Sequence, residues 1–154
     1  MPLSFLRSTL PSESEGRDDA VIGYRFVFGL ATVAGLGALA LGLIVWIFGG
    51  NLIMLHMIFG FTLVLILLGL SLVAVFTKGM RGLGTLGILD AIIVAVVGRT
   101  QTVILTGHLH WLIQAIHLIL GVLAVHLSGT MGLRLLRQKK KYAETGSISP
   151  GGEL

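Results

Sequence analysis

Residues 52–77 read LIMLHMIFGFTLVLILLGLSLVAVFT, and this stretch decides the fold class of the chain. It contains no Asp, Glu, Lys or Arg, and it is long enough to cross the hydrocarbon core of a bilayer, which takes about 20 helical residues. Apolar residues cover all faces of such a helix, as lipid contact requires. The stretch therefore predicts a membrane-spanning helix.

The composition of the whole chain supports the same prediction. The 154 residues are 55% hydrophobic and only 12% charged, whereas a soluble domain carries about 25% charged residues. Cysteine is absent, which excludes disulfides, thiolate nucleophiles and cysteine metal sites. The formal net charge of +4 lies mostly near the chain ends, so it indicates membrane topology rather than binding of nucleic acid.

Three further apolar runs predict that the chain crosses the membrane four times. Together with residues 52–77, the expected spans are residues 20–48, 83–105 and 110–136. Short connections make consecutive helices antiparallel, so the predicted fold class is an all-α membrane protein, a four-helix transmembrane bundle. Residues 1–19 are expected to form a polar N-terminal arm without signal-peptide features. Residues 137–154 are expected to form a basic, flexible tail.

Basic residues predict the orientation of the bundle. They fall in three regions, namely Arg7, Arg17 and Arg25; Lys78 and Arg81; and Arg134, Arg137, Lys139, Lys140 and Lys141. A four-span chain places all three regions on one side of the membrane, and the other two turns carry no Lys or Arg. Because basic loops are retained in the cytoplasm, we expect an integral protein of a prokaryotic inner (cell) membrane with both termini cytoplasmic.

A weak internal repeat pairs two histidines within the apolar runs. His56 opens the phrase HMIFG and His117 opens HLILG, and a shift of 61 residues (56 to 117) aligns the two halves without a gap. The same shift pairs Gly60 with Gly121. Two repeated helical hairpins would place the histidines at equal depth and across the bundle from each other. On the expected topology both histidines lie in the outer half of the membrane.

An ionisable ring at membrane depth is costly and marks a functional site by default. Two histidines that face each other suggest two axial ligands of one heme b, bound through one ring nitrogen each. Gly60 and Gly121, one helical turn along, would leave room for the flat macrocycle. A zinc site is disfavoured because no third ligand is evident nearby. Ligation of a chlorophyll-type pigment, or a plain hydrogen bond from each histidine to a neighbour, remains an alternative.

Other polar residues in the spans are candidates for supporting roles. A stripe on the fourth span is expected to face the bundle interior, and it comprises His110, Gln114, His117, Gly121 and Ser128. Gln114 is therefore a candidate cofactor contact. Arg99 either snorkels to the interface or pairs with heme propionates. His126 lies on the opposite face, and we expect it to pair with Asp90, as a proton relay or a buried hydrogen bond.

With these residues, the chain resembles small four-helix membrane b-type cytochromes, which hold heme between histidines on paired helices. It is also similar to one half of the heme A synthase family, which has a histidine on its second and fourth helices. The resemblance covers residues 20–136 and implies His56 and His117 as the axial ligands. The chain lacks the acidic residue beside the ligand that heme A synthase catalysis would require, which argues against enzymatic modification of heme.

The leading hypothesis is therefore a heme b subunit of a larger membrane redox complex, which transfers electrons between a quinol pool and an outer-side acceptor. We assign no catalytic residue and expect an electron-transfer or accessory subunit rather than an enzyme. The expected partners are the lipid bilayer, the other subunits and a quinone. Two alternatives remain open: a cofactor-free accessory or scaffold subunit of a respiratory or photosynthetic complex, and a (bacterio)chlorophyll-binding subunit.

Overall fold

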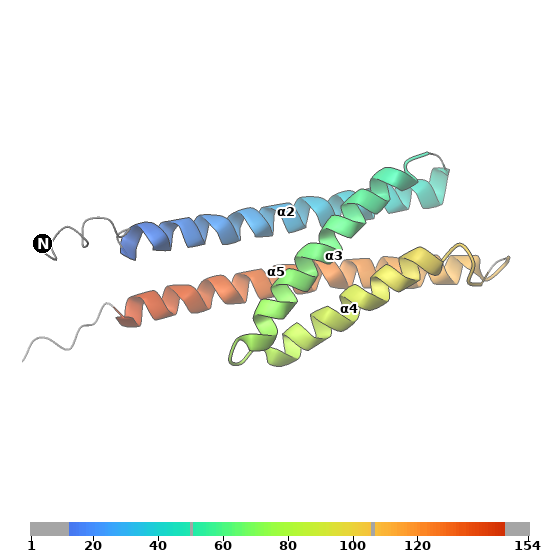
Figure 1. Ribbon diagram of the computed structural model, residues 1–154. Coiled ribbons are helices and arrows are strands. Elements are labelled where there is room, and N and C mark those ends of the chain that lie inside the picture. Colours follow the sequence, from blue (N-terminus) through green and yellow to red (C-terminus); the bar gives the residue numbers. More distant parts are fainter. Residues whose placement is uncertain (1–12, 50, 106, 147–154) are drawn as a thin grey trace, which may run out of the picture.

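The computed structural model describes residues 13–49, 51–105 and 107–146, and these ranges contain helices and turns but no strand. The helices are α2 (Glu13–Phe48), α3 (Ile53–Phe76), α4 (Arg81–Thr100) and α5 (His110–Gly146) (Figure 1). Each includes a segment long and apolar enough to cross a membrane. The prediction of an all-α, four-helix membrane bundle is confirmed.

The helices differ in length from the predicted spans. α2 already begins at Glu13, and α5 continues to Gly146, so residues 13–19 of the predicted arm and residues 137–146 of the predicted tail are helical. These segments are rich in Glu, Arg, Lys and Gln, which are good helix formers. α4 ends at Thr100, before the predicted limit at residue 105. The rest of the predicted arm and tail, residues 1–12 and 147–154, lies outside the described residues.

The four helices pack so that α3 and α5 meet in the middle of the bundle. Both α2 and α4 pack against α3 and against α5, whereas no contact joins α2 to α4 within the described ranges. α3 and α5 also contact each other, and Figure 1 shows α3 crossing α5 obliquely. These two central helices carry His56 and His117.

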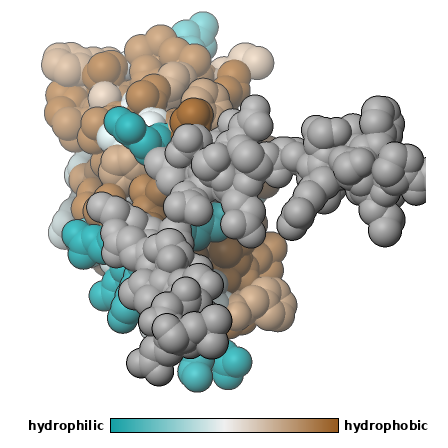
Figure 2. All heavy atoms as spheres, turned by 90° about the vertical axis from the view of Figure 1, so that its left-hand side faces the viewer, coloured by the Kyte–Doolittle hydropathy of each residue, from teal (hydrophilic) through white to brown (hydrophobic). Residues whose placement is uncertain are grey.

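One end of the bundle, here called the basic end, carries most of the basic residues that the structure describes, whereas Arg99 lies at the other end. The start of α2, the α3–α4 turn and the end of α5 lie together at the left of Figure 1, and they carry Arg25, Lys78, Arg81, Arg134 and Arg137. Gln138 Nε2 donates to the carbonyl oxygen of Lys78 at 3.5 Å and links α5 to this turn. Figure 2 looks onto this end and shows hydrophilic side chains among the apolar surface of the helices.

The buried core fills the half of the bundle nearer the basic end. It includes Leu67, Leu70, Ala74, Met80, Ala91, Leu127, Met131 and Leu135. Two glycines bring α3 and α4 together there. A Cβ on Gly84 would lie 2.6 Å from the backbone nitrogen of Val75, and one on Gly87 would contact the hydroxyl of Ser71. This approach of two backbones is the packing that small residues permit between membrane helices.

The predicted pair of His126 and Asp90 is wrong. His126 is exposed on the outer surface of α5, whereas Asp90 is only 2% exposed. Neither carboxylate oxygen of Asp90 has a hydrogen-bond partner in the described part of the chain. The cause is the rotation of α5 about its axis, because packing turns Leu127 and Ser128 inward and this places the preceding residue outside.

Candidate functional site

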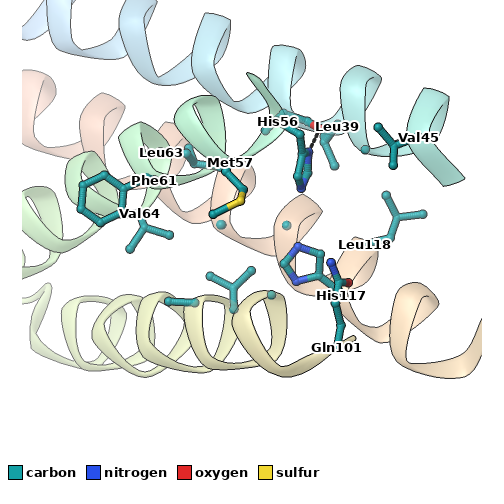
Figure 3. Close-up of a pocket in the computed structure, with 18 of the residues that line it drawn as sticks. Leu39, Val45, His56, Met57, Phe61, Leu63, Val64, Gln101, His117 and Leu118 are labelled. Atoms are coloured by element: carbon teal, nitrogen blue, oxygen red, sulfur yellow. Dashed lines mark hydrogen bonds between the residues drawn. The ribbon is translucent and has the colours of Figure 1, made fainter. Parts of the chain in front are cut away.

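A cavity of about 510 Å³ occupies the half of the bundle away from the basic end. All four helices line it, and Figure 3 shows the side chains around it. Its lining is mostly apolar, with a few polar groups. Both the volume and this lining are typical of small-molecule and cofactor sites, which range over about 300–1,000 Å³. The bundle is thus densely packed at one end and hollow at the other.

His56 and His117 face each other across this cavity. His56 comes from α3 and His117 from α5, and both rings are half-buried. Their ring centres lie 6.2 Å apart, and the ring planes are inclined at 71°. Figure 3 shows the two side chains reaching toward each other. The structure therefore brings together the two histidines that the repeat pairs.

A backbone carbonyl orients the ring of His56. The Nδ1 atom lies 2.8 Å from the carbonyl oxygen of Ala38, on α2. A carbonyl oxygen can only accept, so Nδ1 carries the hydrogen and donates it. In the neutral ring this leaves a lone pair on Nε2. Metal-bound histidines are held in the same way, since the nitrogen that does not bind the metal donates to a carbonyl or carboxylate.

Each histidine ring also packs against a glycine of the preceding helix. A Cβ on Gly42 of α2 would lie 2.9 Å from Cε1 of His56, and a Cβ on Gly98 of α4 would lie 2.8 Å from Cε1 of His117. Real Cβ atoms do not approach other atoms this closely. The two glycines thus provide the space in which the rings lie. The contact between histidine and glycine is the same in the α2–α3 hairpin and in the α4–α5 hairpin.

His117 differs from His56 in its hydrogen bonding. Its Nδ1 atom is buried and has no hydrogen-bond partner among the described residues. A buried polar atom left without a partner costs about 1–3 kcal/mol. A hydrogen-bond partner for Nδ1 of His117 would therefore stabilise the folded protein.

The other predicted site residues also lie around the cavity. Gly60, Gly121, Arg99 and Gln114 all line it. A Cβ on Gly60 would meet no atom within 4 Å, and one on Gly121 would meet only Leu39 Cδ2, at 3.6 Å. Gln114 is half-buried and Arg99 is exposed. A Cβ at Gly60 would therefore lie in open space, and one at Gly121 would make only an ordinary van der Waals contact.

Only part of the polar stripe that was predicted on the fourth span, which is α5, lines the cavity. Gln114, His117 and Gly121 line the cavity. Ser128 lies in the packed core, where its hydroxyl donates to the carbonyl oxygen of Ala124 at 2.8 Å. His110 is half-buried at the start of α5, with a buried Nδ1 that lacks a partner among the described residues.

Sequence reasoning missed three residues that shape the site. Gly42 and Gly98 contact the rings, and the carbonyl of Ala38 accepts from His56. A signal existed for Ala38 and Gly42, because together with Ala31 and Gly35 they form one face of small residues on α2, which indicates close helix packing. Nothing in the sequence indicates which helix packs there or which carbonyl a histidine reaches.

The arrangement offers two facing nitrogen ligands inside an apolar cavity. Among the described residues, no group of three or more His, Cys, Asp or Glu side chains is placed to hold a metal ion. Comparison with protein-family models, curated proteins and solved structures finds no match to this chain.

Proposed function

We propose that this protein binds one heme b between His56 and His117 and transfers electrons as a subunit of a larger membrane redox complex. The observation that carries the proposal is the pair of facing rings, with centres 6.2 Å apart. Two imidazole nitrogens at about 2 Å from one metal put their ring centres about 6 Å apart. The separation of the two rings therefore suits one iron between them.

The surroundings of the rings also fit a heme. His56 is held by Ala38 in the tautomer that leaves Nε2 free to bind. The open space at Gly60 and Gly121 lies one turn along each helix, where a flat ring would extend. The cavity lining is mostly apolar, which suits the porphyrin face and limits access of water.

Bound heme would supply one-electron redox chemistry. His56 and His117 would hold the iron through one ring nitrogen each, and the chain would then serve to carry electrons. Arg99, at the edge of the cavity, would hold the propionates through charge-assisted hydrogen bonds. Gln114 would donate or accept a hydrogen bond at the rim of the macrocycle.

The expected membrane topology and the exposure of residues around the cavity support a position for the heme in the membrane and a quinol as its electron donor. If the basic end faces the cytoplasm, the heme lies toward the outer side of the membrane. Several lining residues are themselves exposed on the surface of the bundle, among them Trp46 (40%), Met57 (59%) and Phe61 (65%). The cavity therefore extends to the lipid-facing surface, where a membrane-dissolved quinol can approach.

The test is a reduced-minus-oxidised difference spectrum and a pyridine hemochrome spectrum of the purified full chain, expressed with heme supplied. We expect b-type absorption with one heme per chain. His56→Ala and His117→Ala should each abolish it. His126→Ala is the matched control, because this histidine is on the same helix as His117 but faces outward, and it should retain full absorption.

Three outcomes would overturn the proposal. The first is a purified, folded chain without b-type absorption, including one that co-purifies with a large complex and carries no chromophore. The second is absorption that survives in both ligand variants. The third is absorption in the red from an extracted chlorophyll-type pigment. Two facing rings favour six-coordinate iron over a pigment magnesium with one histidine ligand.

A further inference from the structure

Asp90 is a buried carboxylic acid that the proposed electron transfer does not use. Its side chain is 2% exposed, and neither oxygen has a hydrogen-bond partner in the described ranges. One turn toward the basic end, a Cβ on Gly87 would contact the Ser71 hydroxyl. One turn in the other direction, Val94 lines the cavity. Asp90 therefore lies between the packed core and the cavity that holds the two histidines.

The neighbours of Asp90 are neutral. α4 packs against α3 and α5 alone among the described helices. The ionisable side chains that these two helices carry within their apolar segments are His56 and His117, at the cavity, His126, on the outer surface, and His110, at the first residue of α5 and far from the basic end. Arg99 lies at the far end of α4, while Lys78, Arg81 and Arg134 lie at the basic end.

The buried polar side chains on the facing helices are hydroxyls. Ser128 donates to the carbonyl oxygen of Ala124 at 2.8 Å, and Ser71 donates to the sulfur of Met131 at 3.8 Å. An ionised carboxylate at Asp90 would thus have neither a hydrogen-bond donor nor an opposite charge from the described residues. Such a buried charge is costly unless something supplies a compensating charge.

We propose that Asp90 is a redox-linked proton site, and this inference rests on the proposed heme. Ferric iron in a porphyrin carries one net positive charge, which balances an ionised Asp90. When one electron from the donor reduces the iron, that charge is lost, and Asp90 takes up one proton from water. On oxidation the electron leaves to the acceptor, and the proton leaves the carboxyl. The charges of the iron–porphyrin core and of Asp90 therefore sum to zero in both states.

The distance allows a measurable coupling between the two sites. Gly98, which contacts the ring of His117, lies about 12 Å further along α4 at the helical rise of 1.5 Å per residue. At that distance and an effective dielectric constant of about 20, one unit charge changes an equilibrium about tenfold. Protonation of Asp90 should therefore favour the reduced heme by about tenfold.

Ser71 is a buried hydroxyl on the side of Asp90 that faces the basic end. The Ser71 hydroxyl lies beside Gly87, which is one turn closer to Arg81 than Asp90 is. On the other side, Val94 lies one turn along α4 from Asp90 and lines the cavity.

The experiment is a reduced-minus-oxidised infrared difference spectrum of the full heme-loaded chain in lipid vesicles. We expect a C=O band of a protonated carboxylic acid to appear on reduction and to shift in heavy water. Asp90→Asn has nearly the same shape but no titratable proton, so it should remove the band. Asp90→Glu should move the band to another frequency, and Ser128→Ala is the control that should keep it. In the wild type the redox midpoint potential should fall with rising pH. In Asp90→Asn the part of this pH dependence that is due to Asp90 should be absent.

The outcomes separate the two proposals. A chain that binds no heme overturns the proposed function, and the coupling with it. A chain with normal heme absorption but no reduction-induced carboxylic acid band overturns the assignment of Asp90 alone. A band that persists in Asp90→Asn does the same. The redox midpoint could instead depend on sodium concentration at fixed pH in the wild type but not in Asp90→Asn. That result would identify Asp90 as a metal-cation site and would also overturn its assignment as a proton site.

Discussion

The imidazole of His117 lies directly against the backbone of Gly98, where a Cβ would come within 2.8 Å of Cε1. His56 has the same relation to Gly42, at 2.9 Å. Each ring therefore lies where the preceding helix has no side chain. The orientation of both proposed ligands depends on two helix–helix contacts as much as on the histidines themselves.

Alanine at either glycine should weaken heme binding without removing a ligand. In Gly98→Ala or Gly42→Ala the new methyl group overlaps the ring, and the ring or the helix must move. Overpacking of this kind costs about 1–3 kcal/mol, so we expect about tenfold weaker heme retention, measured by heme transfer to apomyoglobin. Gly29→Ala is the control, because a Cβ there meets nothing within 4 Å. Equal retention in all three variants would show that the rings do not depend on these contacts.

Free imidazole should replace the side chain of a missing ligand. His117→Gly removes the ring and leaves a space beside Gly98, so we expect loss of the six-coordinate spectrum and its return when imidazole is added. The added ring restores the nitrogen ligand without a covalent link to α5. His126→Gly, which alters an exposed residue, should keep the wild-type spectrum with or without imidazole. A spectrum of His117→Gly that does not respond to imidazole would argue against direct ligation.

Arg99 should influence the heme through its charge. It lines the cavity and is exposed, so its pairing with a propionate is partly screened by water. We expect Arg99→Gln to weaken heme binding by about threefold and to lower the redox midpoint, because a positive charge near the heme favours the reduced state. Arg81→Gln, at the basic end, should change neither. If Arg99 only snorkels to the interface, the midpoint of Arg99→Gln will equal that of the wild type.

The contact of α3 with α4 should depend on Gly84. In Gly84→Ala the new Cβ would lie 2.6 Å from the backbone nitrogen of Val75, and a backbone cannot rotate away as a side chain can. We expect a loss of about 1–3 kcal/mol of stability, measured by reversible unfolding in mixed micelles. Gly82→Ala, two residues earlier and with nothing within 4 Å of its Cβ, should be neutral or slightly stabilising. Equal stability of the two variants would contradict the observed helix contact.

The membrane-spanning architecture could be predicted because it depends on one-dimensional properties. A long uncharged run such as residues 52–77 crosses a bilayer whatever its neighbours are. The candidate ligands His56 and His117 could be named from the sequence for a related reason. Ionisable groups are rare within such runs, and these two occur at matching places. The length of α5 was less predictable, because a polar helix can continue beyond the membrane.

What only the tertiary structure decided is the rotation of each helix about its axis. The sequence alone placed His126 and Asp90 at similar depth, yet packing turns one outward and the other inward. Packing likewise decides that Ala38 offers its carbonyl to His56 and that Gly98 lies behind His117. Hydropathy is nearly uniform around these helices, so it carries little information on which side faces inward. That choice follows from how small residues on one helix fit the side chains of the next.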